Sequence, residues 1–370
     1  MSKKKKRDKP TKGQGLKVVD LFSGCGGLSR GFVDAGYEVI LGVDNDEKAL
    51  ETFRKNHNGA RALSIDLFDK KAVEKIRNEV GGKADVIVAG PPCQGFSLTG
   101  TRKFDDERNR LYLSVIEVVN NLKPRAFLIE NVPGIARLYG GTIKDEIIKR
   151  LGKSGYNVKM EILCAADYGV PQMRKRVFFV GLQKKYGEFV FPKPTHTPEK
   201  YVTCSDAISD LPSLDDELGA EENQYLIPAQ TSYQKMMRKN SEKIYNHVAT
   251  NHTDLVKSVI SFVPEGGNYK DLPSGVGKSR KFNEAWTRYH RKKPSKTIDT
   301  GHRNHFHYQY NRIPTVRENA RLQSFPDDFQ FFGNRTEQNR QVGNAVPPIL
   351  GYHIGRQIFS YLKKRNVGKK

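Results

Sequence analysis

The stretch Leu16-Lys-Val-Val-Asp-Leu-Phe-Ser-Gly-Cys-Gly-Gly27 decides the fold class of this chain of 370 residues. It begins with a short β-branched run that is typical of a buried strand, and an amphipathic stretch, Leu28 to Ala35, follows the glycines. A strand, a glycine turn and a helix in this order open a doubly wound α/β sheet. Gly24, Gly26 and Gly27 also let the backbone approach a ligand where a Cβ atom would collide. We therefore expect an α/β protein that binds a ligand at this turn.

Two acidic side chains follow the glycine turn, the first of them at the end of the second expected strand. The run Glu38–Val43 is followed by Asp44, and Asp66 lies within the run Ser64–Leu67. An acid at the end of the second strand accepts hydrogen bonds from ribose hydroxyls, and a third acid suits an adenine amino group. The pattern predicts a nucleoside-type cofactor. It does not require a phosphate-bearing one, because the glycine pattern of a P-loop is absent from the sequence.

A thiol and a carboxyl group follow two further expected strands, Ala84–Ala89 and Pro124–Ile129. Cys93 lies in the loop Gly90-Pro-Pro-Cys-Gln-Gly-Phe-Ser97, in which two prolines stiffen the chain. Glu130 comes directly after the second of these strands. Because α/β proteins bind ligands at the carboxyl ends of their strands, the two groups indicate a covalent step with a proton donor nearby.

Two arginines, Arg174 and Arg176, precede or begin the apolar run Val177–Gly181. Alternation along a strand would place both on one face, where each suits a phosphate or a base carbonyl. Taken alone, such a pair is more typical of a solvated surface than of a binding site.

Six motifs, in this order, resemble those of the DNA (cytosine-5) methyltransferase family, of the type found with bacterial restriction systems. The motifs are Asp20–Gly27, Gly90–Ser97, Glu130–Val132, Gln172–Arg176, Pro314–Pro326 and Gln341–Pro348. The resemblance covers about residues 17–360. It implies an α/β fold: an S-adenosylmethionine-dependent methyltransferase (Rossmann-like) sheet with a second, smaller target-recognition domain.

The resemblance implies site-specific methylation of a cytosine at C5 in duplex DNA. In the family's mechanism the thiolate of Cys93 adds to C6 and Glu130 hydrogen-bonds or protonates N3, so that C5 attacks the methyl group of S-adenosyl-L-methionine. Arg176 matches a residue that contacts the cytosine O2, and Arg174 matches one that supports the loop and a nearby phosphate. Since these atoms are hidden in a duplex, the cytosine must be flipped out.

The same resemblance carries over residues that would bind S-adenosyl-L-methionine and its product S-adenosyl-L-homocysteine. Phe22 matches a ring that stacks on the adenine, Asp44 matches a ribose contact, and Asp66 matches a contact to the adenine amino group. The full set is Phe22, Gly24, Gly26, Gly27, Asp44, Asp66, Leu111 and Asn344. One departure is Asn45, because many relatives have an aromatic residue there, which leaves the second face of the adenine to be covered differently.

The motif map divides the chain into four parts. We expect a basic disordered tail at residues 1–16 and a catalytic domain at residues 17–185. A target-recognition domain with a hinge follows at residues 186–335. The last segment, residues 336–370, would return to the catalytic domain with a helix from about Val346 to Leu362.

DNA contacts are expected in the loop of Cys93 and in two loops of the recognition domain, Gly275–Lys281 and Gly301–His307. Gln94 and Ser97 lie in the loop of Cys93, and the resemblance implies that they touch DNA. In the recognition domain, the loop Gly301–His307 contains Arg303, which suits guanine in the major groove, and Asn304, which suits adenine.

Three other features of this middle part have ordinary explanations. The acidic stretch Asp206–Glu222 is interpreted as a solvated face, and Trp286 as a core residue. His302, His305 and His307 could suggest a metal, but no metal site is expected there.

With 63 Lys or Arg and 41 Asp or Glu, the chain has a formal net charge of +22, which favours a polyanionic partner. Residues 1–17 hold eight of the cations and one acid, as in a solvated arm, a non-specific DNA contact or a nuclear signal. The four cysteines lie far apart, which argues against a disulfide framework and for a reducing compartment. No apolar run approaches the ~18–20 residues of a membrane span. We expect a monomeric, cytoplasmic, nucleoid-associated enzyme that acts on double-stranded DNA and is functionally paired with a restriction endonuclease.

Two other functions fit parts of the pattern. The tRNA-methylating branch of the same superfamily shares the motifs, but the intervening segment of over 100 residues argues against it. Transfer of labelled methyl groups to tRNA but not to duplex DNA would favour it. A DNA-binding regulator that has lost catalysis is the third hypothesis; Cys93, Glu130 and the glycine turn are all present, so nothing supports such a loss.

Overall fold

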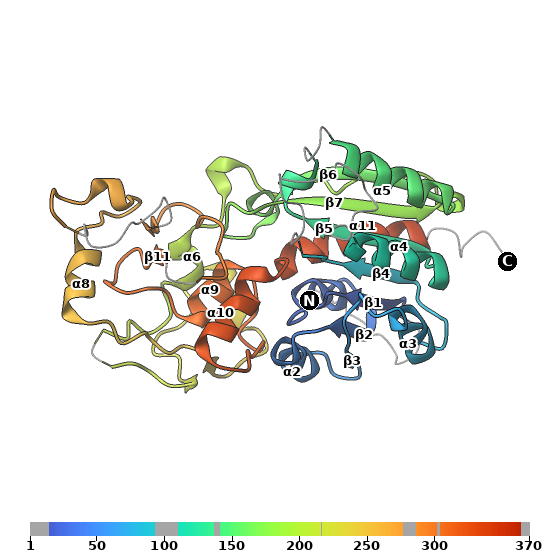
Figure 1. Ribbon diagram of the computed structural model, residues 1–370. Helices are drawn as coiled ribbons and strands as arrows, with labels where there is room; N and C mark the ends of the chain where they lie inside the picture. The colour runs from blue at the N-terminus through green and yellow to red at the C-terminus, as the bar shows by residue number, and fades with distance from the viewer. Residues whose placement is uncertain are drawn as a thin grey trace, which may run out of the picture.

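One mixed sheet of seven strands organises the chain. The computed structural model describes residues 15–92, 110–136, 141–215, 217–276, 286–301 and 304–363 (Figure 1). The strands of the sheet are β1 (Lys17–Leu21), β2 (Glu38–Asp44), β3 (Arg61–Ser64), β4 (Val86–Ala89), β5 (Ala126–Asn131), β6 (Tyr156–Cys164) and β7 (Lys175–Gln183). Their order is β3-β2-β1-β4-β5-β7-β6, with β1 to β5 parallel and β7 antiparallel to both of its neighbours. The expected α/β class is confirmed.

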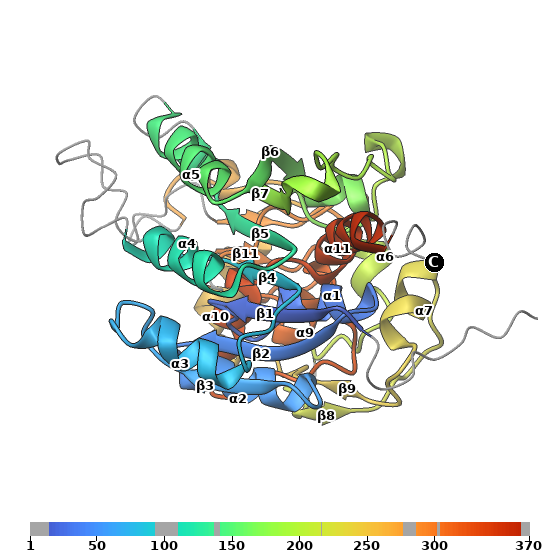
Figure 2. The ribbon, with the colours of Figure 1, turned by 90° about the vertical axis from the view of Figure 1, so that its right-hand side faces the viewer.

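Helices cover both faces of the sheet (Figure 2). On one face lie α3 (Ala72–Glu79), α4 (Arg110–Leu122) and α5 (Thr142–Lys153); on the other lie α1 (Gly27–Asp34), α2 (Glu47–Asn56) and α11 (Pro348–Lys363). Because successive residues of a strand point to opposite faces, Val18 and Val19 of β1 belong to different apolar layers. Both side chains are fully buried, so the sheet is held rigidly between the two layers of helices.

The C-terminal helix α11 packs directly on α1. A Cβ atom on Gly31 would lie 2.4 Å from the carbonyl oxygen of Pro348, so only glycine permits this approach. The hydroxyl of Tyr37 donates to the carbonyl of Gly355 at 3.0 Å. The helix expected from about Val346 to Leu362 is therefore confirmed, and it brings the end of the chain back to the first strand, turn and helix.

The rest of the chain forms short elements beside the sheet, at the left in Figure 1. Its helices are α6 (Cys204–Ile208), α7 (Ser232–Arg238), α8 (Asp254–Ser261), α9 (Val316–Leu322) and α10 (Arg335–Asn344). Two small sheets pair β8 (Glu222–Asn223) with β9 (Ile244–Tyr245), and β10 (Thr287–Arg288) with β11 (His305–Phe306). Short 3-10 turns here are η6 (Pro198–Lys200) and η7 (Tyr269–Asp271), whereas η2 (Pro133–Ala136), η4 (Ala165–Tyr168) and η5 (Lys184–Tyr186) follow the strands β5, β6 and β7 of the large sheet. The division into domains at residues 185 and 335 stays a prediction.

Buried ion pairs hold this part of the chain together. Arg321 is fully buried and pairs with Asp327 at 2.7 Å and with Asp210. Arg312 pairs with Glu318 at 2.7 Å. Although burial alone would raise it, the pKa of the Glu318 carboxyl is held well below its usual range, chiefly by Arg312. Removing one partner of such a pair costs ~3–5 kcal/mol, because an uncompensated charge is left in the interior.

The expectation of a solvated acidic face at Asp206–Glu222 is wrong in part. Asp210 is 1% exposed and pairs with Arg238 and Arg321. The carboxylate of Asp206 caps α6 instead, by accepting the N–H of Thr203 at 2.9 Å. The physical reason is Arg321, which lies 111 residues from Asp210 along the chain and which local composition cannot reveal.

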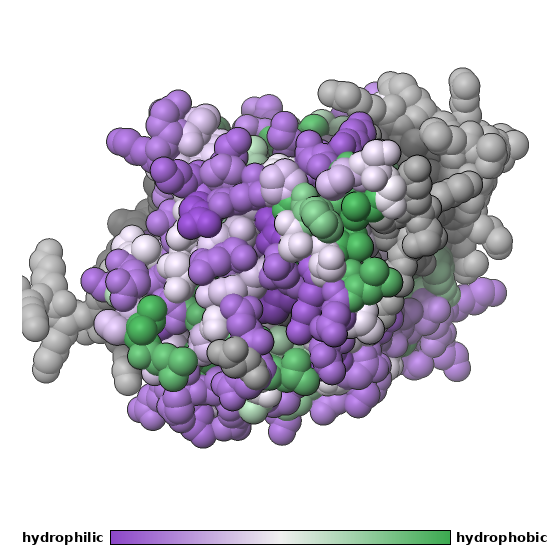
Figure 3. All heavy atoms as spheres, turned by 90° about the vertical axis from the view of Figure 1, so that its left-hand side faces the viewer, coloured by the Kyte–Doolittle hydropathy of each residue, from purple (hydrophilic) through white to green (hydrophobic). Residues whose placement is uncertain are grey.

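The end of the molecule that lies opposite the sheet presents a mostly hydrophilic surface (Figure 3). Hydrophobic side chains form only small, separate patches on this face. Within the described ranges, no helix is long and apolar enough to cross a membrane. Together with the formal net charge of +22, this surface suits a charged partner better than an apolar one.

Candidate active site

The carboxyl ends of β1, β2, β4 and β5 meet at one edge of the sheet. Phe22 follows β1, Asp44 ends β2, Gly90 follows β4, and Glu130 is the penultimate residue of β5. Because β7 is antiparallel, it begins at this same edge, and its second residue, Arg176, lies beside Glu130. The topology therefore gathers the glycine turn, two acids and an arginine from distant parts of the sequence.

The glycine turn after β1 is shaped partly by close packing and partly by open space. A Cβ atom on Gly26 would lie 2.2 Å from Cε1 of His57, and one on Gly27 would lie 2.6 Å from the carbonyl oxygen of Val346. Gly24 differs, since its φ is +51° and no described atom lies within 4 Å of an added Cβ. Two of the three glycines are thus required by the protein's own packing, whereas Gly24 has room beside it for a ligand.

Asp44 is bound to this turn. Its carboxylate accepts the N–H groups of Gly24 and Asn45, both at 2.8 Å, and that of Asp46 at 2.9 Å. Burial raises the pKa of this carboxyl, and the three hydrogen bonds oppose the rise. A carboxylate offers about four acceptor sites, so Asp44 can accept a further hydrogen bond from a hydroxyl group.

The other residues expected around the cofactor lie at different depths. Phe22 is half-buried with a φ of +57°, and Leu111 is 7% exposed at the start of α4. Asp66 and Asn344 are exposed. Asn344 ends α10, and the two residues that follow it contact Gly27, so the last motif returns to the first.

Asp20, to which sequence reasoning gives no role, is buried on β1 next to the turn. It is 1% exposed and accepts the hydroxyl of Ser29 at 2.6 Å. Burial raises the pKa of this carboxyl to about 7. The hydroxyl of Ser23 in the turn is also buried and has no hydrogen-bond partner among the described residues.

Glu130 and Arg176 form the polar centre of the sheet edge. Nε of Arg176 lies 3.0 Å from Oε1 of Glu130, and only 9% of Glu130 is exposed. Burial raises the pKa of the Glu130 carboxyl, with the positive charges of Arg176 and Arg174 opposing it. Gly90 faces the same carboxyl, since a Cβ atom there would lie 3.5 Å from Oε2 of Glu130. The arrangement suits a group that holds a proton at higher pH than an ordinary glutamate.

Arg174 does not share the setting of Arg176. β7 begins at Lys175, so Arg174 precedes the strand, and its side chain is 1% exposed. The expectation of a solvated surface is therefore wrong for Arg174. Burial lowers the pKa of its guanidinium to about 9.

Asn131 is a residue of this edge that sequence reasoning missed. Its side-chain amide donates to the carbonyl of Pro91 at 2.7 Å, which fixes the path of the chain two residues before Cys93. The signal was present, because Asn131 lies inside the motif that begins with Glu130. Cys93 itself lies outside the described residues, as do three of the predicted DNA contacts, Gln94, Ser97 and Arg303.

Comparison with known proteins assigns the chain to a family. The family model for C-5 cytosine-specific DNA methylases matches residues 16–360. The chain is a member of this family. The Type II methyltransferase M1.HphI of Haemophilus parahaemolyticus is 39% identical over 93% of this chain and 86% of its own length. The Type II methyltransferase M.DdeI of Desulfomicrobium norvegicum is 35% identical over 95% of this chain and 90% of its own length. The protein is thus a DNA (cytosine-5-)-methyltransferase, as the motifs predict.

Solved structures agree with the fold of this methylase. A candidate DNA modification methyltransferase encoded within a prophage of E. coli aligns with a TM-score of 0.78 and 28% identity, over 94% of this chain and 99% of that one. The Dnmt2 methyltransferase of S. pombe aligns with a TM-score of 0.57 and 17% identity, over 94% of this chain and 99% of that one. This is a likeness of fold alone. The expected methyltransferase sheet is therefore confirmed.

Residues of the expected recognition loop are bound within the methylase. The side-chain amide of Asn304 donates to the carboxylate of Asp299 at 2.6 Å. His307 is 1% exposed and its Nδ1 faces the N–H groups of Gln309 and Tyr310, while burial lowers its pKa to about 3. Trp286 packs edge-on against the buried ring of Phe306, which confirms its core role.

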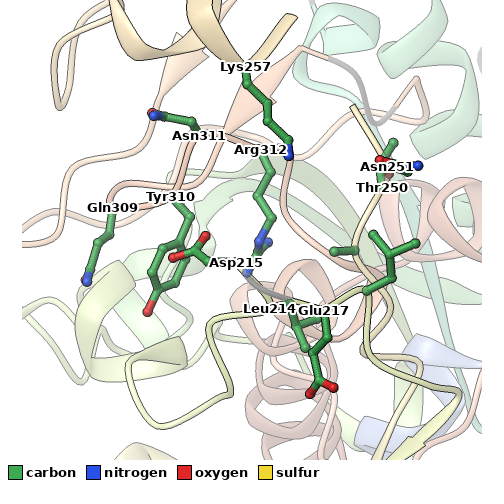
Figure 4. Close-up of a pocket in the computed structure, with 12 residues that line it drawn as sticks. Leu214, Asp215, Glu217, Thr250, Asn251, Lys257, Gln309, Tyr310, Asn311 and Arg312 are labelled. Carbon is green, nitrogen blue, oxygen red and sulfur yellow. The ribbon is translucent and has the colours of Figure 1, made fainter. Parts of the chain in front are cut away.

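The methylase also has a cavity of about 510 Å³, lined by residues of three loops and by Lys257 of α8 (Figure 4). Arg312 reaches into it, but its guanidinium is already paired with Glu318 at 2.7 Å. Among the described residues that are expected to bind cofactor or cytosine, none lines this cavity. The candidate active site is therefore the strand-end group at the edge of the large sheet.

Proposed function

We propose that this protein methylates C5 of a cytosine that is flipped out of duplex DNA, with S-adenosyl-L-methionine as methyl donor and a covalent bond between Cys93 and C6. The observation that carries the proposal is the Glu130–Arg176 pair at 3.0 Å. It lies beside the end of β4, from which the chain leads to Cys93. Relatives named Type II methyltransferases support a role as the modification enzyme of a restriction-modification system, paired functionally with an endonuclease.

The residues at the glycine turn fit S-adenosyl-L-methionine. Gly24 has open space beside it, the buried hydroxyl of Ser23 lacks a partner among the described residues, and Asp44 retains acceptor capacity. The residues that would hold the cofactor are Phe22, Gly24, Gly26, Gly27, Asp44, Asp66, Leu111 and Asn344. When bound, S-adenosyl-L-methionine supplies an electrophilic methyl group.

The chain's own residues would activate the cytosine. As the Cys93 thiolate forms the S–C6 bond, Glu130 gives its proton to N3, so that the ring electrons move to C5 and no negative charge builds up on the ring. The raised pKa of Glu130 supports this role, because a buried carboxyl retains its proton closer to neutral pH. After transfer, loss of the C5 proton lets the S–C6 bond break, and the N3 proton returns to Glu130.

Arg176 would hold the cytosine in contact with Cys93 and Glu130. Its guanidinium is fixed by Glu130 at 3.0 Å and by the carbonyl of Lys175 at 2.8 Å. A guanidinium presents five N–H donors in a planar fork, which suits the O2 carbonyl of the base. Such preorganised donors gain strength in a buried site, where water does not compete.

Sequence recognition would belong to residues 186–335, with residues 336–370 returning to the catalytic part. The buried ion pairs of Arg312 and Arg321 support a rigid scaffold for this role. We propose that Arg303 and Asn304, together with Gln94 and Ser97, contact double-stranded DNA, and that the enzyme acts as a monomer. A net charge of +22 makes DNA affinity fall steeply with salt.

The test is expression of the chain in cells without cytosine methylation, followed by bisulfite sequencing of their DNA. We expect fully protected cytosines at one short recurrent sequence, and none with Cys93→Ala. Methyl transfer to tRNA in place of duplex DNA, or methylation by Cys93→Ala equal to that of wild type, would contradict the proposal.

A further inference from the structure

The segment 171–174, just before β7, pairs with residues 295–298 from the other part of the chain. The N–H of Met173 donates to the carbonyl of Ser295 at 2.8 Å, and the N–H of Ser295 donates to the carbonyl of Pro171 at 2.9 Å. The hydroxyl of Thr297 donates to the carbonyl of Met173 at 3.1 Å. These bonds make a short parallel contact between two backbones that are remote in sequence.

Arg174 joins a third segment to this contact. Its Nη1 donates to the carbonyl of Ile298 at 3.3 Å, and its Nη2 donates to the carbonyl of Gly343, at the end of α10, at 2.9 Å. The acceptors lie 124 and 169 residues away along the chain. Since the side chain is 1% exposed, its two terminal nitrogens are committed inside the protein.

Gly343 closes the same junction by direct backbone contact. A Cβ atom on Gly343 would lie 2.5 Å from the carbonyl oxygen of Asp299 and 2.9 Å from the nitrogen of Thr300. The end of α10 therefore touches the backbone at residues 299–300 with no side chain between them. We call residues 171–174, 295–300 and Gly343 the junction.

The junction lies next to three parts of the proposed site. Arg176 comes two residues after Arg174, and Asn344 comes directly after Gly343. Asp299, at the other side of the junction, accepts the amide of Asn304. A displacement of the junction would thus move the cytosine contact, the cofactor contact and a predicted base contact together.

We propose that Arg174 is a positioning residue that holds Arg176 and Asn344 in fixed relation to the backbone at Ile298, and that it does not bind a DNA phosphate. The assignment rests on the proposed function, since it takes Arg176 and Asn344 as contacts of cytosine and cofactor. A phosphate contact needs an accessible guanidinium, whereas this one is buried and spans two carbonyls. A lysine at this position would keep the positive charge but could not reach both carbonyls. Arg174→Lys therefore separates the effect of the charge from the effect of the two hydrogen bonds.

The experiment compares Arg174→Lys and Arg174→Gln with wild type, on duplex DNA that contains the methylated sequence. We expect both variants to lower kcat at least ~10-fold, because misplacement of reacting groups by about 1 Å costs that much or more. The salt dependence of DNA binding should stay that of wild type. A phosphate contact gives the opposite result: Arg174→Lys retains activity, and Arg174→Gln lowers the logarithmic salt slope by ~0.9.

Gly343→Ala tests the junction without changing Arg174. Its Cβ would displace the backbone at Asp299, so kcat should again fall with an unchanged salt slope. The matched control is Gly152→Ala in α5, where no described atom lies within 4 Å of the added Cβ; it should keep wild-type kcat. Thermal unfolding and S-adenosyl-L-homocysteine binding identify variants that have simply lost the fold.

The outcomes separate the two claims. A wild type that methylates no DNA overturns the proposed function and this inference with it. If wild type is active, either of two results overturns the inference alone. One is a folded Gly343→Ala variant with the kcat of wild type, and the other is a fully active Arg174→Lys variant.

Discussion

Oε1 of Glu130 on β5 lies 3.0 Å from Nε of Arg176 on the antiparallel strand β7. The reversal of β7 is what makes this contact, because a parallel strand would begin at the opposite edge of the sheet. The pair places a buried acid and a fixed cation beside the chain that leads to Cys93. We therefore expect the rate of the reaction to depend on whether the carboxyl of Glu130 carries its proton.

Glu130→Gln should lower kcat by ~10²–10⁴-fold, because the amide can donate a hydrogen bond to N3 but cannot transfer a proton. The raised pKa of Glu130 keeps its proton to higher pH than in an ordinary glutamate, and wild-type activity should decline as pH rises through that pKa. Initial rates measured across a wide pH range, beginning at the ordinary glutamate pKa, should show this descending limb for wild type. If Glu130→Gln shows the same descending limb as wild type, a group other than Glu130 causes the loss of activity at high pH.

Gly24→Ala and Gly26→Ala should fail in different ways. The Cβ at Gly26 meets His57 at 2.2 Å, so this variant should lose ~2–4 kcal/mol of unfolding free energy. The Cβ at Gly24 meets no described atom, and its left-handed backbone should cost only ~1–2 kcal/mol. Gly24→Ala should instead weaken S-adenosyl-L-homocysteine binding more than its stability loss explains. Calorimetry of unfolding and of binding checks both, and equal cofactor affinity in Gly24→Ala and wild type would disprove the assignment.

Asn131→Ala should slow methylation while leaving the protein folded. Loss of the 2.7 Å bond to the carbonyl of Pro91 should cost ~1–3 kcal/mol of stability and lower kcat by ~10–100-fold, because the path toward Cys93 is no longer fixed. The control is Asn157→Ala, whose amide bonds the carbonyl of Gly187 at 3.0 Å on the surface. If both variants keep wild-type kcat, Asn131 has no role at the site.

Asp20 should make the stability of the fold depend on pH. Its folded pKa of about 7 lies above the ordinary 3.8, so the folded state binds the proton more tightly. The resulting stabilisation is complete below pH 3.8 and is lost as pH rises through about 7. Relative to wild type, Asp20→Asn should therefore gain about 3 kcal/mol between pH 5 and pH 8, because about two pH units separate pH 5 from the folded pKa of about 7.

Thermal unfolding of wild type and Asp20→Asn at several pH values measures this difference. The exposed Asp69, whose pKa is lowered by the N–H of Lys71, is the control, because Asp69→Asn should give no gain over this range. A difference between wild type and Asp20→Asn that is constant with pH would contradict the burial argument.

The strands and the glycine turn were predictable because their signals are local. Short apolar runs mark β1, β4 and β5, and in the sequence they lead into the glycine turn, the loop of Cys93 and Glu130. The same reasoning places Asp44 and Glu130 at strand ends, where the structure has them. Their roles toward cofactor and cytosine stay predictions.

The environment of Arg174 was not predictable, because its cause is long-range. Local alternation cannot show that the guanidinium of Arg174 meets the carbonyls of Ile298 and Gly343, which lie 124 and 169 residues away along the chain. Asp210 was misread for a similar reason, since its partner Arg321 lies far away in sequence. Likewise Gly26 and Gly27 suggest a ligand, yet their immediate neighbours are His57 and Val346. Local patterns locate strand ends, and tertiary contacts decide which side chains there are buried.

Trapping on 5-fluorocytosine tests the central claim most directly. Duplex DNA that carries this base at the methylated position should form a stable adduct, because fluorine cannot leave C5 as a proton does. Mass spectrometry of the digested complex should locate the modified nucleotide on Cys93 and on none of the cysteines at positions 25, 164 and 204. With Cys93→Ala no adduct should form, while Cys164→Ser should react as wild type does. Methylation of the ordinary DNA without any adduct on the fluorinated DNA, or an adduct on another residue, would contradict the account.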